Sequence, residues 1–386
     1  MKYSTKQAGM TFVCASTVFF SSASFAVTQG LTTAVEAAYT SDDNVFREKN
    51  GTSDSFLTIA PDLSYTKAFG KHEFTAGYNG KYASYDKNTK ENYTDHTVDV
   101  GMLLDLSKQF NVDLKADYST LHESRGQSGV SANAALDVTT LDKNSVFAGM
   151  AFGRKEAKMQ LELDYAVINT DYTNNNQDIR DRRDDTVSTR LFYNVGAKTK
   201  AFVEAKQTNF NYSSSSSTLD STETLYHAGL RWQATAKTQG EVKVGSFDKD
   251  FDSATETDGD GTSYEASITW SPKTYSNLTL TSSRKPQESA IANENFYTAT
   301  LTSLNWNHEF SKKITVILDA SQSEDDYSAT RNDKTTNAGI AMKYNFRRWL
   351  DFGLSFKNLK RTSNSSANEF TDNTVMFSAT LLHKGK

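Results

Sequence analysis

Apolar and polar residues alternate one by one along many segments of this 386-residue chain. Within residues 157–167 the apolar side chains take the odd positions, and within 110–118 and 314–320 they take the even ones. Mostly polar residues, such as Glu162 and Asp113, fill the positions between them. Side chains alternate between the two faces of a β-strand, so each segment predicts a strand with one apolar and one polar face.

The composition favours one large sheet. A mean hydropathy of -0.61 is too polar for a bundle of membrane helices. The chain has 18 Tyr and 23 Phe but only 3 Pro, as expected of a chain built mostly from paired strands. No helical period, linker or composition break divides it, so we expect a single domain.

The N-terminal residues predict export. Lys2 and Lys6 precede an apolar stretch at 8–20, and Ser24-Phe25-Ala26 offers small residues where a signal peptidase cuts. We expect a signal peptide at 1–26, cleaved after Ala26, and a single barrel domain at 27–386. The alternative, a membrane anchor, needs about 20 apolar residues.

Two consequences follow for the mature chain. Cys14 is the only cysteine and lies in the signal segment, so we expect no disulfide. Loss of Lys2 and Lys6 takes the net charge from -5 to -7, which argues against a nucleic-acid partner.

The alternation predicts about eighteen strands. An even number places both termini of an outer-membrane barrel in the periplasm, although sixteen strands remain an alternative. The expected strands are 31–39, 56–65, 72–85, 94–106, 110–121, 143–153, 156–168, 185–197, 200–212, 222–235, 238–249, 262–271, 276–284, 296–309, 313–322, 335–346, 350–361 and 371–382.

Short and long connections alternate between these strands. Residues 107–109 and 198–200 are short connections, whereas 122–142 and 169–184 are long and polar. Outer-membrane barrels show this asymmetry of short periplasmic turns and long extracellular loops. We therefore expect an all-β, transmembrane, antiparallel up-and-down barrel rather than a soluble sandwich or a solenoid.

In such a barrel the apolar face meets lipid and the polar face lines a water-filled lumen, because so many ionisable groups could not be buried in a dry core. Aromatic residues near strand ends, among them Phe69, Trp270, Phe310 and Trp349, are expected to form interfacial girdles. The pore-lining candidates are Glu73, Lys81, Asp99, Asp105, Asp113, Lys115, Asp117, Lys158, Glu162, Asp164, Arg190, Glu204, Lys206, Arg231, Glu241, Lys243, Glu265, Asp319, Lys343 and Lys357.

A channel is the expected activity, since sixteen to eighteen strands leave room for water inside. The sequence has no phosphate-binding loop, dinucleotide fingerprint, zinc-protease motif or Gly-x-Ser-x-Gly elbow. The acidic stretch at 258–261 lacks the spacing of an EF-hand. We expect no catalysis, cofactor or metal, and an outer-membrane enzyme would have to show turnover.

Three short motifs carry a family resemblance. They are Asp-Asp-Asn-Val-Phe-Arg at 42–47, Asp95-His96, and Leu-His-Glu-Ser-Arg-Gly at 121–126. With their flanking residues they resemble a family of outer-membrane β-barrel porins found with exopolysaccharide and capsule export systems.

The resemblance implies a passive channel that exports a polysaccharide and works with a periplasmic polysaccharide-export protein. The barrel would also contact outer-membrane lipid and lipopolysaccharide. The alternative is a general diffusion porin for small hydrophilic solutes.

Overall fold

The protein is an eighteen-stranded antiparallel barrel. The computed structural model describes residues 29–126, 136–154, 156–235, 237–289, 294–328 and 331–384. The expected signal peptide lies outside them. The strands are β1 (Gly30–Asp42), β2 (Asp54–Phe69), β3 (His72–Tyr85), β4 (Tyr93–Ser107), β5 (Phe110–His122), β6 (Thr140–Phe152), β7 (Met159–Tyr172), β8 (Arg182–Gly196), β9 (Thr199–Tyr212), β10 (Ser221–Thr235), β11 (Thr238–Phe251), β12 (Gly259–Lys273), β13 (Ser276–Glu288), β14 (Phe296–Glu309), β15 (Ile314–Tyr327), β16 (Asn332–Arg347), β17 (Leu350–Ser363) and β18 (Phe370–Lys384).

Each strand pairs with its neighbours in the chain, and β1 pairs with β18 to close the sheet. The closing ladder runs from Thr32 opposite Lys384 to Asp42 opposite Thr374. Closure leaves no strand edge, so the backbone groups that face hydrocarbon can all pair within the sheet. This arrangement confirms the predicted fold and gives eighteen strands rather than sixteen.

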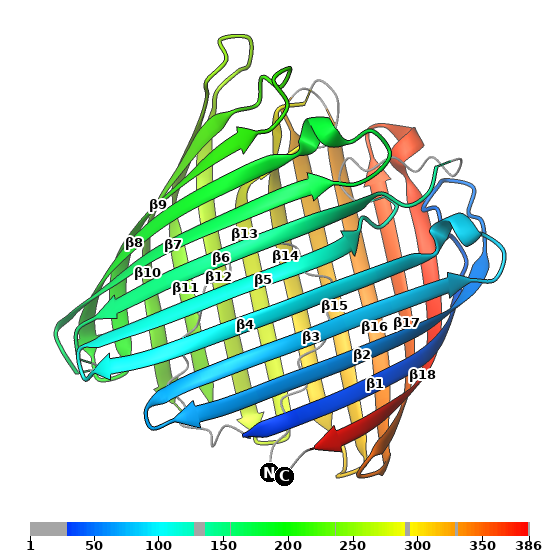
Figure 1. Ribbon diagram of the computed structural model, residues 1–386, viewed down its shortest axis with the longest axis horizontal. Coiled ribbons are helices and arrows are strands. Elements are labelled where there is room, and N and C mark those ends of the chain that lie inside the picture. The colour runs from blue at the N-terminus through cyan, green and yellow to red at the C-terminus, as the bar shows by residue number, and fades with distance from the viewer. Residues whose placement is uncertain are drawn as a thin grey trace.

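The start of β1, the end of β18 and the short turns lie at one end of the barrel, and the long loops lie at the other (Figure 1). Only two residues separate β2 from β3, and one of them, Gly70, has a φ of 63° that favours glycine. Three short 3₁₀ turns, η1 (Thr89–Glu91), η2 (Asp178–Arg180) and η3 (Ser366–Asn368), lie in the long loops.

Among the described residues, we find no helix with the length and apolarity to cross a lipid bilayer.

The strands extend beyond the predicted bounds mainly at the long-loop end. The expected strand 313–322 is Ile314–Tyr327 in the structure, where Asp326 still pairs with Asn332. Near this end polar residues occupy both faces, so the sequence loses its alternation while the backbone pairing continues. Strands of 13 to 16 residues exceed the roughly 10 that a bilayer needs, so the wall projects beyond the membrane.

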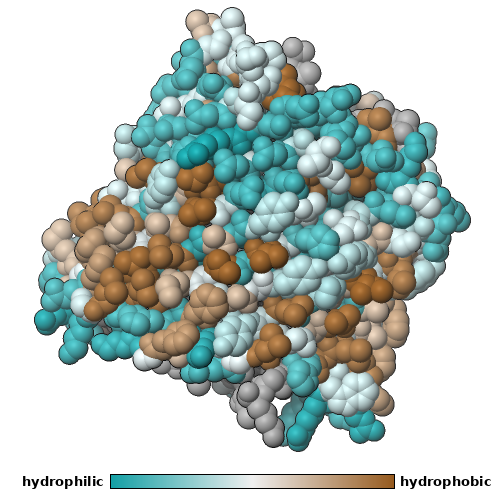
Figure 2. All heavy atoms as spheres, in the orientation of Figure 1, coloured by the Kyte–Doolittle hydropathy of each residue, from teal (hydrophilic) through white to brown (hydrophobic). Residues whose placement is uncertain are grey.

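The outer surface carries an apolar band over the lower part of the wall in the view of Figure 2, with hydrophilic side chains above it. Exposed residues in the middle of strands include Val244, which is 64% exposed, Val203 and Phe356. Phe69, Trp270, Phe310 and Trp349 are exposed beside the short turns, as expected of an interfacial girdle. Lipid contact explains why these side chains point outward.

We predict that Val244→Arg lowers the free energy of unfolding in lipid vesicles by about 2–4 kcal/mol, because it places a charge on the lipid face near mid-strand. Ser321→Arg is the control, since Ser321 in β15 alternates with the exposed Leu318 and faces the interior. Denaturant titration measures both. Equal losses in the two variants would contradict the assignment of faces.

Candidate functional site

Side-chain contacts between strands that are not neighbours identify the inner face. Arg231 Nη1 on β10 lies 3.4 Å from Glu162 Oε1 on β7, and Tyr212 Oη on β9 donates to Glu288 Oε2 on β13 at 2.7 Å. Neighbouring strands are about 4.8 Å apart, so three or four strand spacings amount to roughly 14–19 Å along the sheet. Such pairs can meet only on the concave side, so these side chains point into the barrel.

Arg190 on β8 is the centre of an ionic cluster on this inner face. Its guanidinium lies 3.3 Å from Asp164, 3.7 Å from Glu162 and 3.3 Å from Glu204. Its side chain is almost fully buried, so these carboxylates supply the compensation that a buried charge requires. Arg190 therefore links β7 to β9.

The cluster continues across β10, β11 and β12. Lys243 Nζ lies 2.6 Å from Glu204 and 3.2 Å from Glu265. Arg231 binds Glu241 as well as Glu162. His227 lies between Glu204 at 3.1 Å and Ser263 at 3.0 Å. We call this set the inner-wall cluster: Glu162, Asp164, Arg190, Glu204, His227, Arg231, Glu241, Lys243 and Glu265.

Exposure within the inner-wall cluster is uneven. Its most exposed side chains are the carboxylates Glu265, at 31%, and Asp164, at 21%. The cations are more covered, and Arg231 packs 4.5 Å above the ring of Phe192, which is buried against Phe202. This part of the wall therefore presents mainly negative charge to the interior.

Two other parts of the wall present positive charge. Lys115 on β5 pairs with Asp113 at 2.8 Å, and Lys343 on β16 pairs with Asp351 at 2.8 Å. In both pairs the lysine is the more exposed partner and the aspartate is buried. The interior thus carries at least partly exposed charges of both signs on different strands.

The remaining pore-lining candidates lie outside the inner-wall cluster. Asp99 on β4 is opposite Asp117 on β5, and Asp117 accepts a hydrogen bond from Ser145. Asp319 accepts one from Asn337 at 3.2 Å. Strand parity also places Asp105, Lys206, Glu73, Lys81 and Lys357 on the inner face. Lys158 differs from the expectation, since it precedes β7 and its ammonium lies 5.2 Å from the ring of the exposed Tyr193.

Loops pack together at the long-loop end of the barrel. Asn44 Nδ2 in the β1–β2 loop donates to the Thr371 carbonyl at 2.8 Å. Arg47 lies 3.2 Å from Asp372 on β18 and donates to the Arg125 carbonyl at 2.9 Å. Arg125 in turn forms a buried ion pair of 2.7 Å with Glu91 in the β3–β4 loop. The first loop is thus tied to both β18 and the loop after β5.

Further contacts connect these loops to the loop between β7 and β8. Val138 N donates to the Lys90 carbonyl at 3.2 Å, and Asn174 Nδ2 donates to the Val138 carbonyl at 2.9 Å. Arg180 and Glu123 form an ion pair of 2.7 Å. We call these linked loops, whose described residues are 43–53, 86–92, 123–126, 136–139 and 173–181, the mouth belt.

A second group of ion pairs lies at this end on β16 and β17. Arg331, just before β16, lies 2.5 Å from Asp333, whose side chain is fully buried, and Arg361 lies 3.9 Å from the same carboxylate. Burial alone would lower the pKa of the Arg331 guanidinium, but the hydrogen bond and charge of Asp333 outweigh burial and raise this pKa.

The three sequence motifs have structural roles in and near the mouth belt. Residues of the first motif contact those of the third, because Arg47 binds the Arg125 carbonyl and packs on Gly126. Gly126 has a φ of +62°, and a Cβ there would lie 2.9 Å from the Arg47 Cβ. Asp95 accepts from His122, whose ring stacks on Tyr93 with centroids 3.6 Å apart. These contacts give the motif residues a structural role that does not require the transport of a polymer.

We predict that Arg125→Ala lowers the free energy of unfolding by about 3–5 kcal/mol, because it leaves the Glu91 carboxylate buried and unpaired. Lys49→Ala is the matched control, since Lys49 forms an exposed 3.9 Å pair with Glu369 in the same loop region. Its loss should cost less than about 0.5 kcal/mol. Denaturant titration compares the two, and similar small losses would show that the mouth belt is not held by buried charge.

Comparisons with known proteins support the fold. Among solved structures, Pseudomonas aeruginosa OccK2 (OpdF) is 12% identical with a TM-score of 0.52, covering 92% of this chain and 100% of that one. P. aeruginosa OccK9 (OpdG) is 12% identical with a TM-score of 0.52, covering 92% and 98%. A BenF-like porin from Pseudomonas fluorescens Pf-5 is 11% identical with a TM-score of 0.51, also covering 92% and 98%. No curated protein matches.

The export function expected from the resemblance is wrong on these findings. One of the similar structures is a BenF-like porin, and none of the three names refers to polysaccharide export. The motifs that suggested export bind the loops to one another. The findings favour the alternative, a porin for small solutes.

A family model matches residues 30–383, from the first residue of β1 into β18. The match therefore covers every strand of the barrel, and the fold places the protein in the outer membrane. The chain belongs to the family described as "Putative beta-barrel porin 2".

Proposed function

We propose that this protein is a non-enzymatic outer-membrane channel through which small hydrophilic solutes diffuse. The observation that carries the proposal is the ionic inner face of a closed eighteen-stranded barrel whose outer face is apolar. Barrels of this size have an interior too wide for side chains alone to fill. Water is the medium that can fill it and solvate the exposed ends of the ion pairs.

The mouth belt supports small solutes rather than bulky ones. Asn44, Phe46, Glu91 and Arg125 are each buried, so the loops that carry them are packed together at the long-loop end. Several of these loops are fixed by charged hydrogen bonds, which resist displacement. A conduit with such an entrance suits molecules that pass without moving the loops.

The inner wall supports weak, non-trapping contact with polar solutes. Its groups that are at least partly exposed include carboxylates at Asp164 and Glu265 and ammonium groups at Lys115 and Lys343. Conduction requires binding that is favourable enough to enter and weak enough to leave. Charges already paired with neighbours meet that requirement, because each offers only part of its hydrogen-bonding capacity to a solute.

We predict steady conductance when the purified protein is inserted into planar bilayers. Liposomes that contain it should also swell in small sugars and amino acids but not in dextran of several kilodaltons. Liposomes prepared without protein give the baseline. An electrically silent barrel that admits none of the small solutes would contradict the proposal.

We also predict that K⁺ permeates more readily than Cl⁻, because the inner-wall cluster presents its carboxylates to the interior and covers its cations. The double variant Asp164→Asn/Glu265→Gln should lower the permeability ratio of K⁺ to Cl⁻, read from the reversal potential in a salt gradient. Asp250→Asn is the control, because Asp250 is exposed on the outward parity of β11. An unchanged ratio in the double variant would show that these carboxylates do not face the ion path.

A further inference from the structure

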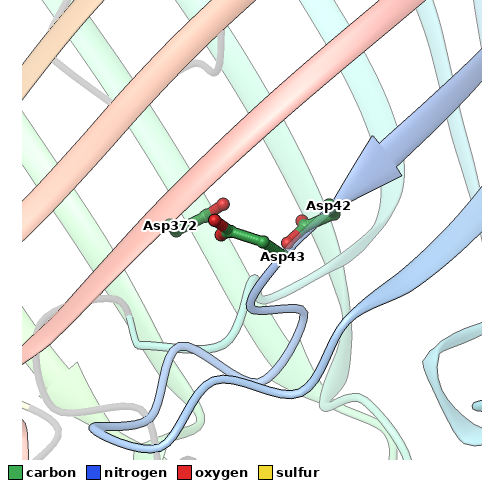
Figure 3. A group of neighbouring side chains, drawn as sticks. All are labelled: Asp42, Asp43 and Asp372. Carbon is green, nitrogen blue, oxygen red and sulfur yellow. The ribbon is translucent and has the colours of Figure 1, made fainter.

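Three carboxylates meet where the first and last strands join. Asp42 ends β1, Asp43 begins the following loop, and Asp372 is the third residue of β18 (Figure 3). One carboxylate oxygen from each lies within 4.8 Å of the other two. Among the described residues, no other group of three possible metal-ligating side chains meets this spacing.

Among the described residues, ion pairs balance only part of this charge. In the described part of the chain, Arg47 is the one cation that forms an ion pair with this group, and its Nε lies 3.2 Å from Asp372 Oδ2. The other contacts are neutral: Asn44 N donates to Asp42 at 2.7 Å, and Asn373 donates to Asp43 from its backbone at 2.7 Å and its side chain at 2.8 Å. Three carboxylates thus face one guanidinium.

A second observation does not depend on the number of carboxylates. Asp372 is 3% exposed, and its Oδ1 accepts no hydrogen bond although it is buried. The Asp372 carboxylate lies on the side facing Asp43 and Asp42 in Figure 3. A buried carboxylate oxygen without a donor is costly, because such atoms are almost always satisfied by protein, water or an ion.

We propose that Asp42, Asp43 and Asp372 bind a divalent cation at the outer rim of the barrel, with Ca²⁺ preferred over Mg²⁺. An all-carboxylate donor set suits hard cations. Asp43 is exposed, so water can complete the coordination, and Ca²⁺ tolerates the irregular geometry that Mg²⁺ does not. Sites of this kind on extracellular modules bind Ca²⁺ with a dissociation constant of about 10⁻⁴–10⁻³ M.

The cation would reinforce the closure of the barrel. Asp42 and Asp372 lie on the two strands that pair to close the sheet, and Asp43 begins the loop that Arg47 ties to β18. A bound ion would therefore hold the end of β1, the beginning of β18 and the mouth belt together. Without it, the carboxylates repel one another across this junction.

Equilibrium dialysis against ⁴⁵Ca²⁺ tests the site on the detergent-solubilised full barrel. We expect one Ca²⁺ per chain, displaced by excess Ca²⁺ more effectively than by equal Mg²⁺. Asp42→Asn and Asp372→Asn should each weaken binding at least tenfold, and Asp250→Asn should bind like the unmodified protein. Absence of binding to the unmodified protein, or unchanged binding in Asp42→Asn, would overturn the proposal.

Thermal unfolding at a fixed scan rate separates a cation site from a purely structural cluster. With a chelator, Asp42→Asn should unfold at a higher temperature than the unmodified protein, because a repelling charge is gone. Ca²⁺ should raise the unfolding temperature of the unmodified protein and leave that of Asp42→Asn unchanged. A lower unfolding temperature of Asp42→Asn in chelator, with the same response to Ca²⁺ in both proteins, would show that Asp42 acts through its hydrogen bond alone.

Discussion

Pairing of the backbone inside a lipid bilayer is the constraint on which this structure depends. Hydrocarbon offers no hydrogen bonds, so a sheet that crosses it must have no free edge. The chain meets this requirement by bringing β18 back to β1, strands that lie more than 300 positions apart in sequence. The even number of strands and the position of the start of β1 beside the end of β18 follow from that antiparallel closure. The apolar outer face follows from contact with lipid.

Closure also explains where the charges lie. Once the apolar residues face lipid, every charged residue of opposite parity must face the interior, where the strands of a curved wall bring side chains close. Glu162 and Arg231 are separated by two intervening strands yet form an ion pair there. The inner-wall cluster is therefore a product of curvature as much as of sequence, and its covered cations and partly exposed carboxylates make this part of the wall negative.

The sequence predicts the strands well because each strand carries its own alternation of apolar and polar residues. The bounds expected for 72–85 and 296–309 agree with the structure to the residue. The sequence does not predict the inner-wall cluster as a unit, because alternation assigns a side chain to a face but says nothing of the curvature that brings β7 near β10. It also misses the mouth belt, whose contacts join loops without periodicity. The motifs at 42–47 and 121–126 marked its residues, and their mutual contacts became visible only in three dimensions.

Spin labels along one strand test the central claim most directly. Cys14 is the only cysteine, so after its replacement by serine single cysteines can be placed at 316–323 in β15 and labelled in lipid vesicles. We predict an alternation with a period of two. Oxygen, which concentrates in lipid, should reach labels at 316, 318, 320 and 322, and a water-soluble nickel complex should reach those at 317, 319, 321 and 323. Uniform accessibility, or the opposite phase, would contradict a lipid-embedded tube with water inside.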